Sequence, residues 1–377
     1  MLALNDEQKL WAKNIYDKII AKETTVIKRS GEKIPYTTEN GVFNDKFATD
    51  PSWWTNCFWH GILWQMYVES KDEYFRELAC KLEERMDAVL YNPEAVHHDV
   101  GFLWLQASVA NWRITGNDAS KKRGLLAASY LTSRYNLGGG FITAWNGDDR
   151  KNWSIIDTMM NLPLLYWASE VTGYDRYEKI ARAHADKTME CVIRPDGSAI
   201  HIIEYDLSDG AVLATQGGQG YEVGSSWTRG QAWAIYGFAL SWLHTRDARY
   251  LDAAKRLAHY FLAASAPYDY VPPIDFRQPA EPRYIDTTAG AIAACGMIEI
   301  AKALAETNES NLYLYGAMRL LGALEAGHAD WGDASDAILH NGSEAYPPRG
   351  VHMDIIYGDY FFIEAFFKLA GQGFIVF

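Results

Sequence analysis

The chain repeats one structural unit: a polar or glycine-containing loop, an apolar helix rich in small residues, a short turn and an amphipathic helix. Successive units begin roughly 45 to 70 residues apart, a spacing that suits a helical hairpin followed by a loop of variable length. A unit of this kind buries its apolar helix only against neighbouring units, so the repeat constrains the fold strongly. The apolar helices are predicted to start near Trp54, Asp99, Asp157, Trp227, Asp286 and Tyr357.

The two helices of each unit differ in polarity. The first helices, such as "NLPLLYWASEVTG" and "QAWAIYGFALSWL", are apolar on nearly all sides and should be buried. The second helices carry Lys, Arg and Glu on one face and should lie outside. In "LHTRDARYLDAAKRLA" and the equivalent turns, an Asp is placed to cap the second helix.

The repeat predicts an all-α fold, an (α/α)6 barrel of six helical hairpins that spans residues 1–377 as a single domain. Five complete pairs are joined by an N-terminal helix near residues 6–22 and a last inner helix from about 358 to 370, which would pair and close the ring. An open α-solenoid is the competing architecture, and the long irregular loops before the inner helices argue against it. Short β hairpins are expected within 138–145 and 198–207.

Composition excludes several classes of partner. The net charge of −13 argues against nucleic acid and anionic membranes, and no apolar run approaches a membrane span. The four cysteines form no C-x-x-C pair, so neither a zinc site nor a disulfide framework is indicated. Because the N-terminus resembles an amphipathic helix and not a signal peptide, we expect a cytoplasmic protein. We also expect a monomer or weak dimer. The 14 Trp and 23 Tyr exceed what a core needs, and aromatic faces commonly pack against sugars.

All the long loops precede inner helices, so they should gather at one end of the barrel. Polar residues at the inner-helix starts would then line one central cleft. The residues that this cleft would collect are Trp54, His97, His98, Asp99, Trp145, Asp157, His201, Gln216, Trp227, Arg229, Trp233, Asp286, His352 and Asp359.

Two of these residues predict acid/base chemistry. Asp157 lies inside the apolar run "WSIIDTMMNLPLL", where desolvation should raise its pKa toward that of a general acid working near neutral pH. A second carboxylate nearby, Asp99, would raise it further. Two carboxylates in dissimilar surroundings are typical of sugar-cleaving enzymes. For Asp99, Asp286 and Asp359, each taken alone, the role of a helix N-cap is the favoured alternative.

The other polar candidates also have structural alternatives. His97, His98 and Asp99 are adjacent, and adjacent residues seldom point at one ion, so we expect no metal there and favour hydrogen bonding instead. Arg229 stands at a helix N-terminus, where an anion would be stabilised, although a lone arginine is usually solvated. Trp233 is equally compatible with the core.

Six segments, in order from about Trp53 to Ala365, resemble the motifs of the unsaturated glucuronyl hydrolases, glycoside hydrolase family 88. They are "HHDVGFLW", "FITAW", "IIDTMMNLPLLYWASEVTG", "SSWTRGQAWAIYGFAL", "DTTAGAIAACGMIEIA" and "YGDYFFIEA". The resemblance implies an (α/α)6 barrel that acts on products of polysaccharide lyases, which carry a C4=C5 double bond in a non-reducing-end uronic acid. It also implies hydration of this vinyl ether, with no direct attack at the anomeric carbon.

The resemblance assigns roles by position. Asp157 would protonate C4 and then activate water for addition at C5, while Asp99 would hold the ring hydroxyls and tune Asp157. Contacts to the uronate would come from His98, His201, Gln216, Arg229 and Trp233, and Trp54 and Trp145 would wall the pocket. The partner implied is an unsaturated uronic-acid oligosaccharide, and no metal or organic cofactor is needed.

Departures from the family pattern concern specificity. The loop "EAYPPRGVHMDIIYGDY" lacks the Ser/Lys cluster by which some relatives accept sulfated fragments, although Arg349 and His352 could meet an anionic aglycone. The segment before Asp50 matches poorly. The alternatives are an unsaturated rhamnogalacturonyl hydrolase acting on pectin fragments, and a non-hydrolytic sugar-binding or epimerase-type barrel.

Overall fold

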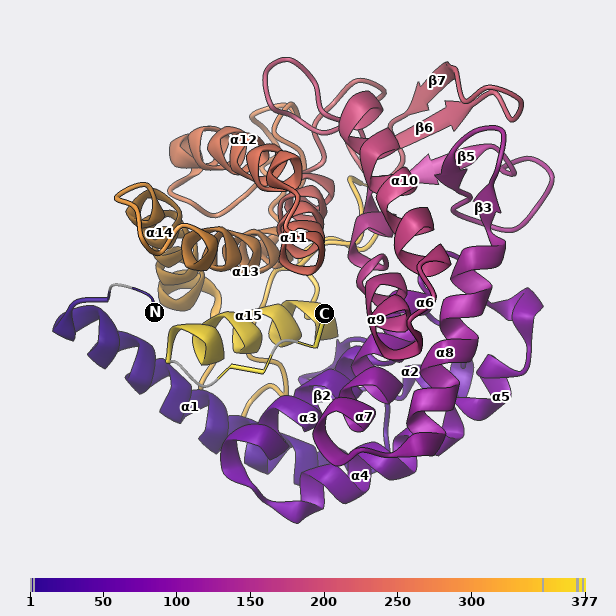
Figure 1. Ribbon diagram of the computed structural model, residues 1–377. Coiled ribbons are helices and arrows are strands. Elements are labelled where there is room, and N and C mark those ends of the chain that lie inside the picture. The colour runs from indigo at the N-terminus through magenta and orange to yellow at the C-terminus, as the bar shows by residue number, and fades with distance from the viewer. Residues whose placement is uncertain (1, 3, 348, 371–372, 375) are drawn as a thin grey trace.

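The computed structural model describes residues 2, 4–347, 349–370, 373–374 and 376–377, and the chain is mainly helical (Figure 1). The inner helices are α3 (Phe58–Ser70), α6 (Val100–Trp104) continued by the π-helical η2 (Leu105–Val109) and α7 (Ala110–Thr115), α9 (Pro163–Thr172), α11 (Thr228–Thr245), α13 (Thr287–Ala303) and α15 (Ile356–Leu369). The outer helices are α1 (Asp6–Ser30), α4 (Glu73–Arg85), α8 (Asp118–Ser133), α10 (Arg176–Val192), α12 (Ala248–Ser265) and α14 (Ser310–His328). Shorter helices are α2 (Lys46–Thr49), α5 (Asp87–Leu90), η1 (Pro93–Ala95), η3 (Ile156–Met160) and η4 (Ala266–Tyr268).

The inner helices form a closed ring. Going round it, α3 packs against η2, η2 and α6 against α9, α9 against α11, α11 against α13, α13 against α15, and α15 returns to α3. Five outer helices each cover the inner helix that precedes them, and α1 covers the junction of α15 and α3. Figure 1 shows the indigo α1 beside the yellow α15. This closure confirms the predicted (α/α)6 barrel and excludes the open solenoid. That residues 1–377 make a single domain stays a prediction.

Small residues let the inner helices approach closely. A Cβ added to Gly237 of α11 would lie 2.5 Å from the Cβ of Met159 in η3, and one added to Gly296 of α13 would lie 2.9 Å from the Cα of Tyr236. Contacts this short leave no room for a side chain. The richness of the inner helices in Gly and Ala therefore follows from their close packing.

Three small sheets lie in the loops. β1 (Thr38–Glu39) pairs with β2 (Val42–Phe43), and β3 (Tyr135–Asn136) pairs with β4 (Phe141–Ile142). β5 (Trp153–Ile155), β6 (Ile202–Tyr205) and β7 (Val212–Gln216) form an antiparallel sheet with β6 in the centre. Strands occur in both expected segments, but 198–207 was expected as part of a hairpin, and β6 also pairs with the distant β5. No periodicity within the segment could indicate that partner.

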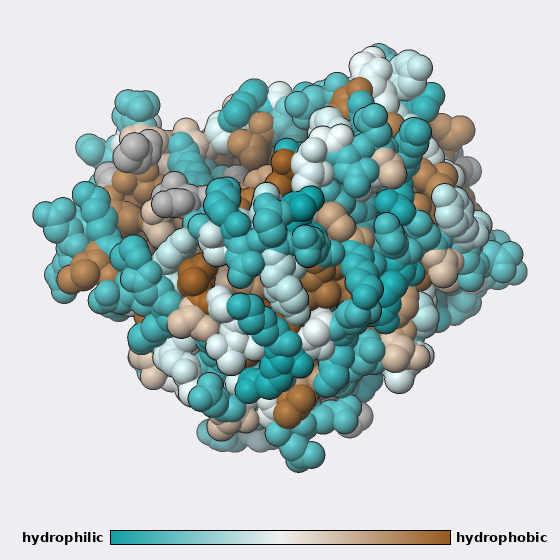
Figure 2. Space-filling view, turned by 90° about the horizontal axis from the view of Figure 1, so that it is seen from below, coloured by the Kyte–Doolittle hydropathy of each residue, from teal (hydrophilic) through white to brown (hydrophobic). Residues whose placement is uncertain are grey.

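The face of the molecule in Figure 2 is mostly hydrophilic, and its hydrophobic residues are scattered in small groups. Among the described residues, no helix combines the length and apolar character needed to cross a membrane. The four cysteines are free thiols; Cys57 and Cys295 are buried, and Cys80 and Cys191 are partly buried.

Candidate active site

A pocket of about 410 Å³ opens at the end of the barrel where the inner helices begin. Asp99 directly precedes α6, Asp157 lies in η3 ahead of α9, and Arg229 and Tyr357 lie in the first turns of α11 and α15. The prediction that inner-helix starts line one cleft holds for four of the six predicted starts, Trp54, Asp99, Asp157 and Tyr357, whereas Trp227 and Asp286 lie outside the lining. The lining comprises Tyr36, Trp53, Trp54, His97, His98, Asp99, Trp145, Arg150, Trp153, Ile155, Asp157, His201, Ile202, Gly218, Gln219, Arg229, Glu344, Ala345, Arg349 and Tyr357.

Asp157 is buried at the floor of this pocket. The chain reaches it from β5, turns through the 3-10 helix η3, and begins α9 only at Pro163, whose fixed φ suits the first helical position. Burial raises the pKa of Asp157 to about 7, although the positive charge of Arg229 opposes the shift. Its Oδ2 has no hydrogen-bond partner among the described residues. Asp157 thus has the proton affinity of a general acid.

Asp99 stands at the N-cap position of α6, but its side chain makes no capping hydrogen bond within the described chain. The capping alternative is therefore wrong for this residue. Burial raises the pKa of Asp99 well above its usual value, and the charge of Asp157 raises it further. We expected Asp99 to raise the pKa of Asp157. The repulsion is found instead on Asp99, whose pKa the charge of Asp157 raises, whereas Asp99 is not among the causes of the Asp157 shift.

Asn161 joins the two carboxyl-bearing segments. Its Oδ1 accepts a hydrogen bond from the backbone N–H of Phe102 at 2.7 Å, which satisfies a free donor in the first turn of α6. Its Nδ2 donates to Asp99 Oδ1 at 3.3 Å and to the carbonyl of Asp157 at 3.2 Å. Asn161 was missed in the sequence because nothing in "MMNLP" distinguishes it from an ordinary loop asparagine.

Two histidines flank the carboxyl groups. His201 stacks on Trp227 with ring centroids 4.1 Å apart, and its Nε2 lies 3.8 Å from Asp157 Oδ2. Its Nε2 has no hydrogen-bond partner within the described chain, and burial lowers its pKa to about 3, so the ring is neutral. His98 Nδ1 lies 3.2 Å from Thr158 Oγ1, and burial lowers the pKa of His98 as well.

Tryptophans wall the pocket as expected. Trp54 packs at 5.2 Å on Tyr357, and Trp145 lies edge-on to His98 at 5.8 Å. Trp53 and Trp153 extend these walls. Such a surface suits the apolar faces of a pyranose ring.

Arg229 lines the pocket but is already paired. Its Nη1 donates to the carboxylate of Asp286 and to the carbonyl of Ser343, and its Nη2 donates to the carbonyl of Glu344. Asp286 also caps α13 through the N–H of Thr288, so the capping alternative is right for Asp286. The alternative of a solvated arginine is wrong, since Arg229 is only 1% exposed.

Two predicted contact residues are not in the lining. Gln216 pairs across the sheet with Ile202, which does line the pocket, and its amide donates to Glu204 on the same face. Trp233 is fully buried and packs against Phe102. Its indole N–H has no hydrogen-bond partner of ordinary geometry in the described chain. The indole nevertheless lies close enough to Asp157 to lower the pKa of Asp157. The other cleft candidates outside the lining are Trp227, Asp286, His352 and Asp359.

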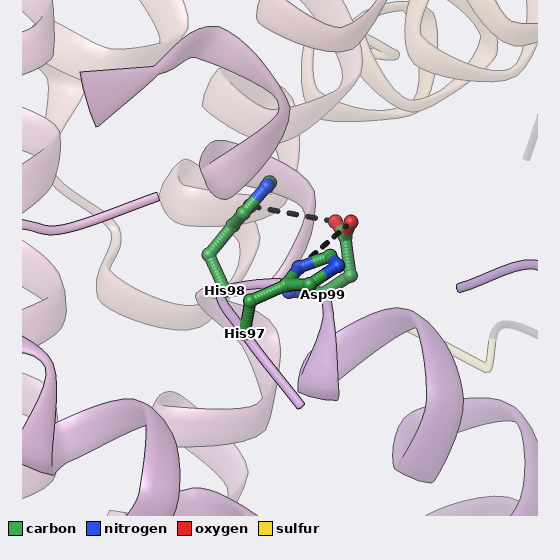
Figure 3. A group of neighbouring side chains, drawn as sticks. All are labelled: His97, His98 and Asp99. Atoms are coloured by element: carbon green, nitrogen blue, oxygen red, sulfur yellow. Dashed lines mark hydrogen bonds and ion pairs between the residues drawn. The ribbon is translucent and has the colours of Figure 1, made fainter. Parts of the chain in front are cut away.

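His97, His98 and Asp99 converge, contrary to the expectation that adjacent side chains would diverge (Figure 3). His97 Nδ1 lies 3.4 Å from Asp99 Oδ2, and His98 Nδ1 lies 3.4 Å from Asp99 Oδ1. The turn before α6 brings all three toward the pocket. The absence of a metal from the chemistry stays a prediction.

Several lining residues have no recognisable signal in the sequence. Tyr36 and Glu344 come from segments outside the helical repeat, and the Tyr36 hydroxyl donates to the Glu344 carboxylate. Arg349, which the sequence suggests only as a contact for an anionic aglycone, lines the pocket.

Comparison with known proteins fits this geometry. An unsaturated glucuronyl hydrolase from Bacillus sp. (strain GL1) is 38% identical over 356 residues, which are 91% of this chain and 92% of the relative. The chain belongs to the unsaturated glucuronyl hydrolase family. No family model matches the chain.

Other members of the unsaturated glucuronyl hydrolase family are similar over nearly the full length. An unsaturated chondroitin disaccharide hydrolase from Streptococcus pneumoniae is 33% identical over 327 residues, 85% of this chain and 82% of the relative. The crystal structure of the unsaturated glucuronyl hydrolase from Streptococcus agalactiae has a TM-score of 0.89 at 30% identity and covers 100% of this chain and 95% of that one. The structure from Bacillus sp. GL1 has a TM-score of 0.87 at 35% identity, with 96% and 97% covered. Family membership makes the chain a glycoside hydrolase and favours it over the sugar-binding and epimerase alternatives.

Proposed function

We propose that this chain releases the unsaturated uronic acid from the non-reducing end of lyase-generated oligosaccharides by hydrating its C4=C5 double bond. The observation that carries the proposal is a buried carboxyl, Asp157, with a pKa of about 7 at the floor of a tryptophan-walled pocket. A vinyl ether needs a proton donor that is still protonated near neutral pH, and an ordinary aspartate is not.

In the proposed reaction, Asp157 gives its proton to C4, and the electron pair of the double bond forms the new C4–H bond. The positive charge that develops at C5 and the ring oxygen lies beside the newly formed Asp157 carboxylate, in a site with little water to screen it. Asp157 then accepts a proton from water as the water oxygen bonds to C5. The resulting hemiketal opens as the bond between C5 and the ring oxygen breaks, which leaves a ketone at C5 and a hydroxyl on C1. The proton of this hydroxyl passes to the glycosidic oxygen as the glycosidic bond breaks, so C1 becomes an aldehyde and the aglycone leaves as an alcohol.

The neighbouring residues would hold the sugar. Burial and the charge of Asp157 raise the pKa of Asp99 well above its usual value, and its carboxyl group faces the pocket, where it can hydrogen-bond to ring hydroxyls. His201 and His98 are neutral and offer further hydrogen bonds. Arg229 would contact the uronate, although Asp286 already balances its charge, so we infer that it acts by directional donation more than by net charge.

Relatives differ in substrate. One solved complex contains dGlcA-Glc-Rha-Glc, one from Streptococcus agalactiae contains dGlcA-GalNAc6S, and another family structure is described as specific for heparin. Because the loop around Arg349 lacks a Ser/Lys cluster, we propose that this chain prefers unsulfated unsaturated glucuronyl disaccharides.

The test is a panel of unsaturated disaccharides from chondroitin, heparin, gellan, xanthan and rhamnogalacturonan, assayed by loss of the ultraviolet absorbance of the conjugated double bond. We expect the absorbance to fall on unsulfated glucuronyl substrates and fall more slowly on sulfated ones. Activity confined to the rhamnogalacturonan disaccharide would support the pectin alternative. No loss on any member of the panel would refute the proposal.

A further inference from the structure

The side chains of His97, His98 and Asp99 form a three-ligand cluster on the wall of the pocket (Figure 3). One ligand atom from each residue lies within 4.8 Å of the other two, and no ion is present. His97 has no part in the proposed hydration, although its ring stands 5.2 Å from that of His98. The cluster therefore contains a residue that the reaction does not use.

We propose that this cluster binds a zinc-class transition-metal ion that competes with the sugar for Asp99 and His98. A tetrahedral zinc ion with ligand bonds of about 2.0–2.1 Å separates its ligand atoms by about 3.3 Å. His97 Nδ1 lies 3.4 Å from Asp99 Oδ2 and His98 Nδ1 lies 3.4 Å from Asp99 Oδ1, separations that are long for a hydrogen bond but close to that tetrahedral edge. Because they end on different oxygens, binding through one oxygen requires a rotation of the carboxyl group or of His97, whose side chain is 28% exposed.

Both Nδ1 atoms can be unprotonated. The backbone N–H of Asp99 is directed at His97 Nδ1 at 3.5 Å, and the hydroxyl of Thr158 lies 3.2 Å from His98 Nδ1, where it can donate. An Nδ1 that accepts a hydrogen bond carries no proton, and a metal ion would take the place of that hydrogen bond because each ring nitrogen has one lone pair. The pocket has room for a water as the fourth ligand, the arrangement of open zinc sites.

The ligand set selects the class of ion. Two imidazole nitrogens and one carboxylate suit Zn²⁺ and similar transition metals, whereas Mg²⁺ and Ca²⁺ prefer oxygen ligands. Bound zinc would occupy the Asp99 carboxylate and the His98 ring, which the proposed reaction needs for the sugar. The predicted consequence is reversible inhibition, not a catalytic requirement.

Binding is tested by titrating metal-free protein with zinc chloride in a calorimeter. We expect one site per chain, and we expect His97→Ala to weaken it by at least about tenfold, because one of three protein ligands is lost. The conservative His97→Gln, which keeps a polar side chain of similar size, should weaken binding likewise. His259→Ala on the outer helix α12 and the double variant Cys80→Ser/Cys191→Ser are controls that should bind zinc as the wild type does. Wild-type affinity in both His97 variants, loss of binding in the cysteine variant, or equal binding of Mg²⁺ would overturn the proposal.

The competition depends on the proposed hydrolase activity, so it is a separate measurement. Zinc should raise the KM for the unsaturated disaccharide more than it lowers kcat. The turnover of His97→Ala with zinc, measured relative to its own turnover with a chelator, should be at least about tenfold less sensitive to zinc than that of the wild type. An enzyme without hydrolase activity would remove this readout but leave the calorimetric one intact. Zinc inhibition that persists unchanged in His97→Ala would contradict competition at this cluster.

Discussion

Asp157 and Asp99 are the same residue type in two different surroundings. Burial sets the pKa of Asp157 near 7, with Arg229 holding it from rising further, while Asp99 is buried and also faces the Asp157 charge. The Asp157 carboxyl therefore titrates near neutral pH. A pKa in this range lets Asp157 both give and take a proton at working pH.

The first prediction is the direction of the pH dependence of turnover. The reactive form has Asp157 protonated, so kcat should be level below pH 7 and fall about tenfold per pH unit above it. The measurement is kcat at saturating disaccharide, with circular dichroism at each pH to show that the fold persists. A kcat that rises with pH through this range would contradict the assignment.

The same shift predicts a pH dependence of stability. The folded pKa of Asp157 is about 7 against an ordinary 3.8, so the protonated folded state is favoured at low pH. Its contribution to stability is complete below about pH 4 and is lost as pH rises toward 7, by up to about 4 kcal/mol. Asp157→Asn should therefore gain free energy of unfolding relative to the wild type between pH 5 and pH 7.5, as measured by urea denaturation. An equal difference at the two pH values would show that Asp157 does not titrate in this range.

How far single residues could be predicted depended on where their partners lie. The burial of Asp157 was visible in its own apolar run. The state of Arg229 was not, because its partners Asp286 and Ser343 are 57 and 114 residues away in the chain. Only the ring closure brings them together.

At the scale of elements, helical periodicity predicted the repeat well. The site residues that it did not predict lie in the segments between the helices. The starts of α6, α11, α13 and α15 agree with prediction to within a residue or two, whereas α9 begins at Pro163 and leaves Asp157 in a 3-10 turn. Tyr36 and Glu344 lie in irregular segments, where no period indicates which way a side chain points.

The close packing of α6 on the segment around Asn161 gives an element-scale prediction. A Cβ at Gly101 would lie 2.5 Å from the Cα of Asn161 and 2.6 Å from its Oδ1. Gly101→Ala should displace Asn161 from Asp99 and cost about 1–3 kcal/mol of stability, with a loss of kcat. Gly322→Ala on the outer helix α14 is the matched control, because its added methyl meets nothing within 4 Å. That variant should be neutral or gain up to about 1 kcal/mol. Both free energies come from denaturant unfolding, and equal effects of the two substitutions would contradict the packing argument.

At the scale of the whole molecule, a buried charge network joins three inner helices. Lys368 of α15 lies 3.1 Å from Glu299 of α13 and 2.6 Å from Glu364, and it donates to the hydroxyl of Tyr236 of α11 at 2.6 Å. None of these residues lines the pocket. The network stabilises the ring without entering the chemistry.

Replacing Lys368 should therefore separate stability from catalysis. Lys368→Met leaves Glu364 without a cation and Glu299 with Lys302 alone, and it should lower the free energy of unfolding by about 3–5 kcal/mol, while KM at low temperature stays unchanged. Lys302→Met is the control, since Lys302 pairs with the same Glu299 from a partly exposed position and should matter less. If Lys302→Met were the more destabilising of the two, Lys368 would not be the central charge of the network.

The central claim is that Asp157 supplies the proton that starts hydration. Asp359 offers a matched control, because burial raises its pKa to about 7 as well, yet it accepts hydrogen bonds from the backbone of Ile338 and Leu339 and does not line the pocket. The deciding measurement is the rate of ultraviolet absorbance loss from an unsaturated glucuronyl disaccharide by Asp157→Asn and Asp359→Asn, with disaccharide binding measured by calorimetry. We expect Asp157→Asn to bind the disaccharide but to turn it over about 10² to 10⁴-fold more slowly than the wild type. Folded Asp359→Asn should keep the wild-type kcat. Wild-type turnover by Asp157→Asn would contradict the central claim.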